Sequence, residues 1–129
     1  MFSNIDMKRI LAVDDNTDIL EILRYILEDS GYEVDTLADG HHLFDKIHEH
    51  MPDLILLDIM LGDLDGRILC KTVKTTKETH DIPVILISAS HNIENTFGQG
   101  GAPDDFIAKP FDMFVLLNSI ERQLALAAW

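Results

Sequence analysis

Apolar residues along this chain fall into short continuous runs that alternate with stretches of helical spacing. Continuous apolar runs are typical of strands covered on both faces of a parallel sheet, whereas apolar residues three or four positions apart form one face of an amphipathic helix. The runs predict strands at residues 9–13, 54–57, 84–87 and 105–108, and residues 33–36 have the composition of a shorter strand. The alternation predicts an α/β fold of five strand–helix units around one core.

Polar and glycine residues mark where the predicted helices begin and end. Asn16 is a favourable cap for the first helix, and Gly31 ends that helix. Asp65-Gly66 begins the third helix and Asp112 begins the last one. The apolar positions predicted to face inward are 19, 22, 23, 26 and 27 in the first helix, 43, 44 and 47 in the second, 69, 70 and 73 in the third, and 113, 116, 117, 120 and 124 in the last.

The composition excludes several classes of function. The chain has 129 residues, which predicts a single domain spanning residues 1–129. Its formal charge of −13 opposes binding to nucleic acid or anionic lipid, because such binders need Lys and Arg to displace counterions from phosphates. No apolar stretch is long enough to span a bilayer or to act as a secretory signal, and Cys70 has no partner for a disulfide. We therefore expect a cytoplasmic location and no membrane partner.

Residues with reactive or charged side chains follow the apolar runs. Asp14 and Asp15 follow the first run, Asp58 the third, Ser88 the fourth and Lys109 the fifth. In open α/β sheets, ligands bind outside the carboxyl ends of the strands. We therefore expect three carboxylates, a hydroxyl and an ammonium to meet at one end of the sheet.

Such a cluster has a definite electrostatic problem. Carboxylates about 5 Å apart repel by roughly 3 kcal/mol per pair at an effective dielectric near 20. Protonation of one acid relieves this repulsion, but a hard divalent cation does so better, and Mg²⁺ is the cation that one or two carboxylates commonly hold. A carboxylate also attacks phosphorus to form an acyl phosphate, and a metal, Lys109 and Ser88 would neutralise the transferring phosphoryl oxygens.

The order and spacing of these residues resemble the receiver domain of two-component response regulators, from about residue 8 to about residue 124. Asp65-Gly66 and the stretch Asp-Asp-Phe-Ile-Ala-Lys-Pro-Phe at 104–111 strengthen the resemblance. It implies a flavodoxin-like, doubly wound fold, with a five-stranded parallel sheet in the order 2-1-3-4-5 and helices on both faces. It also implies a signalling domain that promotes only its own phosphorylation and dephosphorylation, and is not otherwise an enzyme.

The resemblance assigns roles to the acidic residues. Asp58 is expected to be the phosphoacceptor. Asp15, Asp58 and the backbone carbonyl of Met60 are expected to ligate Mg²⁺, and Asp14 to act mainly through a metal-bound water.

The resemblance also assigns roles around the phosphoryl group. Ser88 is expected to meet the phosphoryl oxygens, Ala89 to leave room for them and Lys109 to pair with their charge. Lys109-Pro110 is expected to be a cis peptide bond. Ser88 would be coupled to a switch residue, Phe106, which has no hydroxyl and would operate by packing inward or outward.

The implied partners are proteins. A sensor histidine kinase or a histidine phosphotransfer protein would donate the phosphoryl group from a phosphohistidine. The output would be a conformational change near the fourth helix, fifth strand and fifth helix, followed by slow hydrolysis. Because only residues 125–129 follow the last helix, we expect a downstream protein target or a covalently linked domain to receive the signal.

Two segments depart from the family pattern. Gly62 stands where many relatives have Pro, so we expect a looser loop after Asp58. Pro103 follows a segment, residues 91–101, in which three glycines leave room for only a short fourth helix. These departures bear on partner choice more than on chemistry.

Three other functions fit parts of the sequence. A magnesium-dependent phosphatase of the haloacid-dehalogenase type needs a general acid two residues after its nucleophile, where this chain has Met60 after Asp58 and Asn16 after Asp14. A flavodoxin-like cofactor module would have its phosphate repelled by Asp14 and Asp15. A degenerate receiver that works without phosphorylation is disfavoured by the intact set of site residues.

The chain also carries several histidines, His41, His42, His48 and His50, close together in sequence. Their spacing fits a metal site poorly, and a solvated helix face is the favoured interpretation.

Overall fold

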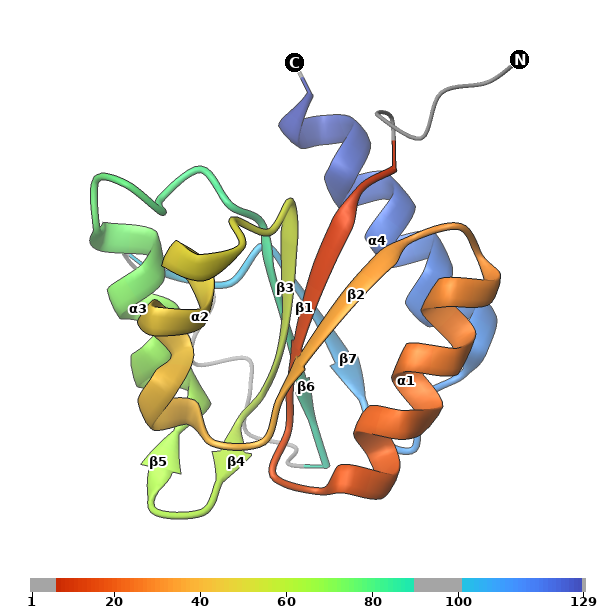
Figure 1. The fold of residues 1–129 in the computed structure, drawn as a ribbon, viewed down its shortest axis with the longest axis horizontal. Helices are drawn as coiled ribbons and strands as arrows, with labels where there is room; N and C mark the ends of the chain where they lie inside the picture. The colour runs from red at the N-terminus through yellow and green to blue at the C-terminus, as the bar shows by residue number, and fades with distance from the viewer. Residues whose placement is uncertain (1–6, 90–100, 129) are drawn as a thin grey trace.

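The computed structural model describes residues 7–89 and 101–128 as a parallel five-stranded sheet between two layers of helices (Figure 1). The strand order is β2-β1-β3-β6-β7, which confirms the predicted order 2-1-3-4-5 because β6 and β7 are the fourth and fifth strands of this sheet. The sheet strands are β1 (Arg9–Val13), β2 (Glu33–Leu37), β3 (Leu54–Asp58), β6 (Val84–Ser88) and β7 (Asp105–Ala108). All neighbouring pairs are parallel.

The strands end slightly later than their apolar runs. Asp58 is the last residue of β3 and Ser88 the last residue of β6, although both are polar. Every residue of β3 and β6 is buried, as predicted for strands covered on both faces. The strands therefore carry these two polar side chains to the edge of the core without an intervening loop.

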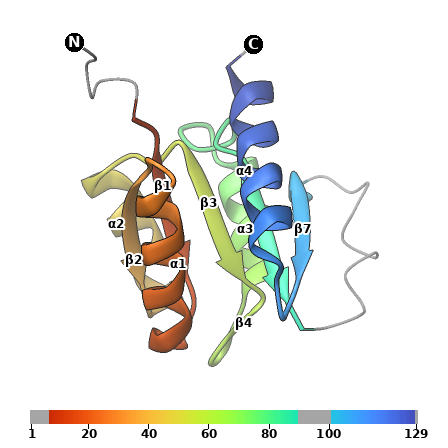
Figure 2. The same ribbon diagram turned by 90° about the vertical axis from the view of Figure 1, so that its right-hand side faces the viewer.

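Two hydrophobic clusters join the helices to the sheet. Helices α2 (Leu43–Glu49) and α3 (Gly66–Thr75) cover one face, with Leu43, Ile47 and Val73 fully buried. Helices α1 (Thr17–Asp29) and α4 (Met113–Ala127) cover the other face and lie toward the viewer in Figure 2. Each fully buried Leu or Ile contributes roughly 1.5–3 kcal/mol to folding, so both layers are held firmly.

The inward faces of α1 and α4 differ in part from the prediction. Asn16 caps α1 as expected, by accepting hydrogen bonds from the backbone N–H groups of Asp18 and Ile19. However, the buried residues of α1 are Leu20, Leu23 and Leu27, while Ile22 is 53% exposed. In α4, Leu116 and Ile120 are buried as predicted, Met113 is exposed, and the polar Ser119 and Gln123 are buried.

Cys70, on the inward face of α3, is fully buried. Its thiol lies 3.7 Å from the carbonyl oxygen of Gly101 and donates a weak hydrogen bond to it. Burial raises the pKa of the Cys70 thiol to about 12. Cys70 is therefore a core residue with a thiol that stays protonated.

Residues 60–65 form a hairpin that the sequence pattern did not predict. Met60–Leu61 (β4) pairs with Leu64–Asp65 (β5) in antiparallel register, in place of the looser loop expected at Gly62. Gly62 has a φ of +65°, and a positive φ at the first central residue is typical of a type II′ turn. Pro cannot adopt this value, which explains why Gly suits the position.

The predicted short fourth helix lies outside the described residues, apart from Gly101. None of the helices described by the structure combines the length and the apolar character needed to cross a bilayer.

Candidate functional site

The carboxyl ends of four strands meet at one end of the sheet. The parallel register aligns Asp58 with Ile87 and Ser88 with Ala108, so β3, β6 and β7 end close together. Figure 2 shows β3 and β7 pointing toward the same end of the molecule. Asp14 and Lys109 directly follow the ends of β1 and β7.

Three aspartates form an acidic cluster at this end. Asp14, Asp15 and Asp58 each offer a carboxylate oxygen within 4.8 Å of the others. Asp14 and Asp58 are buried, whereas Asp15 is exposed. The structure thus brings together the three acids singled out in the sequence, with Asp15 on the solvent side.

Asp14 is held from both sides of its carboxylate. Oδ1 accepts a hydrogen bond from the backbone N–H of Asn16 at 2.9 Å, and Oδ2 accepts one from Nζ of Lys109 at 2.8 Å. The backbone N–H of Asp14 donates to the carbonyl of Leu37 at 3.1 Å. Asn16 therefore caps α1 and also fixes Asp14, a role that the cap pattern alone did not reveal.

Asp58 has a different environment. Its Oδ2 lies 3.4 Å from Nζ of Lys109, and its carboxylate also accepts a hydrogen bond from the backbone of Met60. Burial, and then the charge of Asp14, raise the pKa of Asp58, while Lys109 and Met60 oppose the rise. Burial also works against the charged form of Lys109, but Asp14 and Asp58 together outweigh it and raise the pKa of the ammonium. The site is thus a buried patch of excess negative charge that favours a proton or an added cation.

Gly66 fixes the backbone around Asp58. Its N–H donates to the carbonyl of Ile59 at 2.7 Å. A Cβ placed on Gly66 would lie 2.1 Å from the carbonyl oxygen of Asp58 and 2.8 Å from Cα of Ile59, both backbone atoms that cannot easily move. The Asp65-Gly66 pair thus does more than begin α3, as the sequence indicated, because only glycine allows the helix to start against the end of β3.

Ser88, Ala89 and Lys109 lie on two adjacent segments. Ser88 is buried, and its carbonyl accepts a hydrogen bond from the backbone N–H of Lys109 at 2.9 Å. Ala89 is exposed and carries only a methyl group. The Lys109-Pro110 bond is cis, as expected.

Phe106, the expected switch residue, lies on β7 opposite Leu86 of β6. Its side chain is half-buried and packs against the hydrophobic cluster beneath α2 and α3. The ring is therefore in contact with the core, two residues along each strand from the Ser88–Ala108 pair.

The donor atoms of the acidic cluster suit a hard cation. Carboxylate oxygens are the ligands that Mg²⁺ takes in proteins, and it usually keeps several waters. Asp14, Asp15 and Asp58 supply such oxygens, with access to solvent at Asp15. The backbone carbonyl of Met60 belongs to the segment that follows Asp58 directly.

The histidines do not form a comparable site. His41 and His42 lie on a short 3₁₀ turn, His48 is on α2 and His50 follows that helix, and all four are exposed. Over residues 7–89 and 101–128, the three aspartates are the sole group of His, Cys, Asp or Glu residues that could hold a metal.

Comparison with protein families identifies one match over most of the chain. A family model described as the response regulator receiver domain matches residues 10–121. This span includes all of the site residues described above.

Solved structures show the same similarity. A CheY-like response regulator receiver domain protein from Methanospirillum hungatei is 33% identical, with a TM-score of 0.86, covering 95% of this chain and 98% of that one. The receiver domain of NtrX from Brucella abortus is 37% identical, with a TM-score of 0.80 and coverages of 90% and 98%. A signal receiver domain of a histidine kinase from Syntrophus aciditrophicus is 32% identical, with a TM-score of 0.82 and coverages of 92% and 90%.

Proposed function

The chain belongs to the response regulator receiver domain family of two-component systems, and from this premise we propose that Asp58 accepts a phosphoryl group from a phosphohistidine donor. The observation that carries the proposal is the placement of Asp58 at the end of β3, within 4.8 Å of two further carboxylates and 3.4 Å from Lys109. This arrangement can hold a cation and a phosphoryl group side by side.

Asp58 suits the role of nucleophile better than its two neighbours. Asp14 is bound on both oxygens by Asn16 and Lys109, and Asp15 is exposed to water. Asp58 is buried but keeps a looser contact with Lys109. Burial and the charge of Asp14 raise the pKa of Asp58, so added positive charge would favour the ionised, nucleophilic carboxylate.

The residues present fit Mg²⁺. Asp15, Asp58 and the carbonyl of Met60 would hold the ion, with Asp14 acting through a bound water. When bound, Mg²⁺ supplies positive charge that offsets the repulsion among the carboxylates and the charge of phosphoryl oxygens.

Phosphoryl transfer from the donor histidine to Asp58 needs no further reactant. A carboxylate oxygen of Asp58 forms a bond to phosphorus as the phosphorus–nitrogen bond to the donor histidine breaks, and the ring nitrogen keeps the electron pair. Lys109 and the Ser88 hydroxyl lie at the neighbouring strand ends to stabilise the phosphoryl oxygens, and Ala89 leaves space for them. Attack by water on phosphorus later returns Asp58 and inorganic phosphate, so the domain acts only on its own phosphoryl group.

The output step would run from Ser88 to Phe106. A hydroxyl drawn toward the phosphoryl oxygens leaves the space beside β7, and the half-buried Phe106 ring can then move inward. The surface that changes would comprise β7, α4 and the predicted fourth helix. A sensor histidine kinase or histidine phosphotransfer protein would act upstream in the cytoplasm, and a protein target or covalently linked domain downstream, with residues 1–129 acting as one domain.

Phosphorylation by a small donor tests the proposal. Incubation with acetyl phosphate and Mg²⁺ is expected to add one acid-stable, alkali-labile phosphoryl group, measured by intact mass. Asp58→Asn should abolish the label, whereas Asp45→Asn, a change at an exposed residue of α2, should retain it.

Other outcomes would change either the phosphorylated residue or the function assigned to the domain. A label that persists in Asp58→Asn would remove Asp58 from the role. Absence of label in the unmodified protein, from acetyl phosphate and from histidine kinases alike, would favour the degenerate receiver. Multiple-turnover hydrolysis of small phosphate esters would favour the phosphatase.

A further inference from the structure

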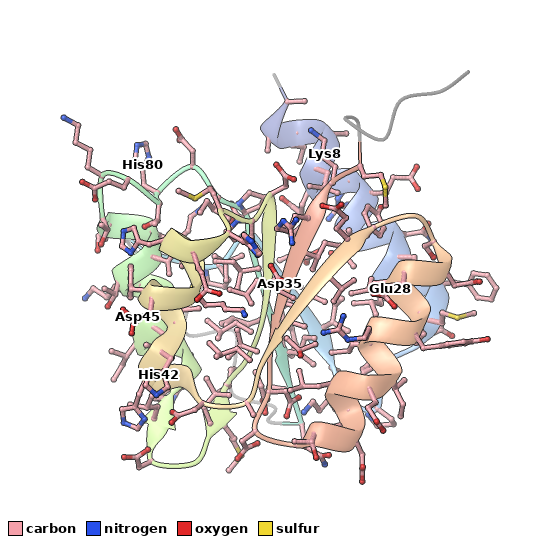
Figure 3. The ribbon with its side chains drawn as sticks, in the orientation of Figure 1. Lys8, Glu28, Asp35, His42, Asp45 and His80 are labelled. Atoms are coloured by element: carbon pink, nitrogen blue, oxygen red, sulfur yellow. The ribbon has the colours of Figure 1, made fainter. Side chains whose placement is uncertain are left out.

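The turn that carries His41 packs against the hairpin that follows Asp58. The turn is a short 3₁₀ helix, Gly40–His42 (η2), and a Cβ placed on Gly40 would lie 3.0–3.2 Å from the side chains of Leu61, Leu64 and Leu69. This close approach brings η2 onto the β4–β5 hairpin. Figure 3 shows His42 at the end of α2 nearest the hairpin labelled in Figure 1.

The imidazole of His41 lies between two carboxylates from different segments. Nδ1 is 2.7 Å from Oδ1 of Asp39, which also accepts the backbone N–H of His41 at 2.9 Å. Nε2 is 3.5 Å from Oδ2 of Asp63, in the turn of the hairpin. The ring therefore bridges η2 and the hairpin.

This geometry favours one protonation state. A neutral imidazole has one N–H donor and one lone pair. Either neutral tautomer would place a lone pair against a carboxylate, facing Asp39 in one case and Asp63 in the other. The imidazolium donates from Nδ1 to Asp39 and places positive charge, with no lone pair, against Asp63 at Nε2.

We propose that protonated His41 is a pH-sensitive tether between η2 and the β4–β5 hairpin, released when His41 loses its proton. The contact that opens is the one to Asp63, because it is longer and the Asp63 side chain is 77% exposed. The tether itself is independent of the proposed function. One consequence does rest on that function: the tether would restrain the segment that carries Met60, whose carbonyl is a proposed metal ligand.

The charged groups around His41 give the direction of the effect. Asp39 and Asp63 face it directly, and His42 lies nearby, 3.9 Å from Asp39 and 3.7 Å from Asp45. The hydrogen bond to Asp39, and then the charge of Asp63, raise the pKa of His41. The tether is therefore complete below the ordinary pKa of histidine and is lost as pH rises through the raised value.

An NMR titration of the protein without Mg²⁺ or donor tests this proposal. The His41 ring is expected to titrate above the ordinary histidine value, and Asp63→Asn should lower its midpoint. Solvent exchange at the amides of residues 61–64, corrected for intrinsic pH dependence, should become roughly two- to fivefold faster between about pH 5.5 and about pH 8.5 in the unmodified protein. In Asp63→Asn, exchange should be fast at both pH values.

A matched pair at another site provides the control. His80 and Asp81 lie 3.1 Å apart on the segment before β6, at the opposite end of the molecule from His42 (Figure 3). Asp81→Asn should leave the His41 midpoint and the hairpin exchange unchanged. A His41 midpoint unaffected by Asp63→Asn, or the same pH dependence of hairpin exchange in both proteins, would overturn the proposal. Both readouts are independent of phosphorylation at Asp58.

Discussion

Each end of the sheet holds a basic residue among three acids, yet the two ends differ in character. At the amino end, the Arg9 guanidinium binds Glu33 at 2.8 Å and Asp35 at 3.0 Å, and its backbone N–H binds Asp53 at 2.7 Å. At the carboxyl end, Lys109 lies 2.8 Å from Asp14 and 3.4 Å from Asp58, with Asp15 alongside. In both clusters one cation therefore lies among three carboxylates.

The difference lies in solvation. The side chains of Glu33 and Asp35 are 45% and 18% exposed, whereas those of Asp14 and Asp58 are 2% and 7% exposed. Ion pairs in water contribute about 1 kcal/mol or less, but buried ions lose several kcal/mol of hydration each unless they are compensated. Burial, more than the number of charges, therefore distinguishes the carboxyl end of the sheet from the amino end.

The largest expected effect comes from the glycines at the two ends. Gly66→Ala forces a Cβ onto the backbone of Asp58 and should lower the free energy of unfolding by about 3 kcal/mol or more. Gly31, before β2 at the amino end, has a φ of +95° and open space around its Cβ position. Gly31→Ala should cost only about 1 kcal/mol, from backbone strain alone. Urea denaturation measures both, and similar losses would contradict the role assigned to Gly66.

The next largest difference between the two ends is expected when the basic side chain of each, Lys109 or Arg9, is replaced by Met and the loss in free energy of unfolding is compared. Lys109→Met leaves two buried carboxylates without their ammonium and should cost about 2–4 kcal/mol near neutral pH. The cost should shrink in acid, because protonation of Asp58 relieves the repulsion. Arg9→Met should cost about 1 kcal/mol or less, with a further reduction in salt. Equal losses in urea denaturation at both ends would show that solvation does not separate them.

The smallest expected effect comes from replacing Asp58 or Asp35 by Asn, which should change the free energy of unfolding in opposite directions. Because the folded pKa of Asp58 is raised, the native state loses stability as pH rises from the unfolded value through the folded one. Asp58→Asn should therefore be more stable than the unmodified protein near neutral pH without Mg²⁺, and the difference should vanish in acid. Asp35→Asn should instead lose about 0.5–1 kcal/mol, because it weakens the contact with Arg9.

Added Mg²⁺ sharpens this last test. A cation that binds only the folded state raises the free energy of unfolding by an amount that grows with the ratio of its free concentration to its dissociation constant. Mg²⁺ should stabilise the unmodified protein and Asp35→Asn more than Asp58→Asn in thermal denaturation. Equal stabilisation of all three proteins would show that Asp58 does not contribute to the cation site.

The sheet and the position of the site were predictable from sequence, because short apolar runs identify the strands and parallel strands end at the same edge. The apolar runs ending in Asp58 and Ser88 fix both the central strands and the polar residues at their ends. Parallel strands then place those ends together without any knowledge of loop structure. For this reason, the three acids and Lys109 were correctly expected at one end of the sheet.

Features that depend on tertiary contacts were missed. The two-residue strands of the hairpin are too short to show a period. Apolar residues on α1 wrap around more than one face, so Leu20 could not be distinguished from Ile22 until the helix was docked. On α4, Ser119 is buried because its hydroxyl donates to Asp105, and Gln123 because its amide reaches the carbonyl of Asp104 at 3.3 Å.

The protonated thiol of Cys70 has a practical value for following the motions proposed above. Maleimide and disulfide reagents react with thiolates, so Cys70 stays silent in the folded protein. No other cysteine occurs in the chain. A single engineered thiol, such as Met60→Cys at an exposed side chain of the hairpin, can therefore carry a fluorophore or spin label without first replacing a native cysteine.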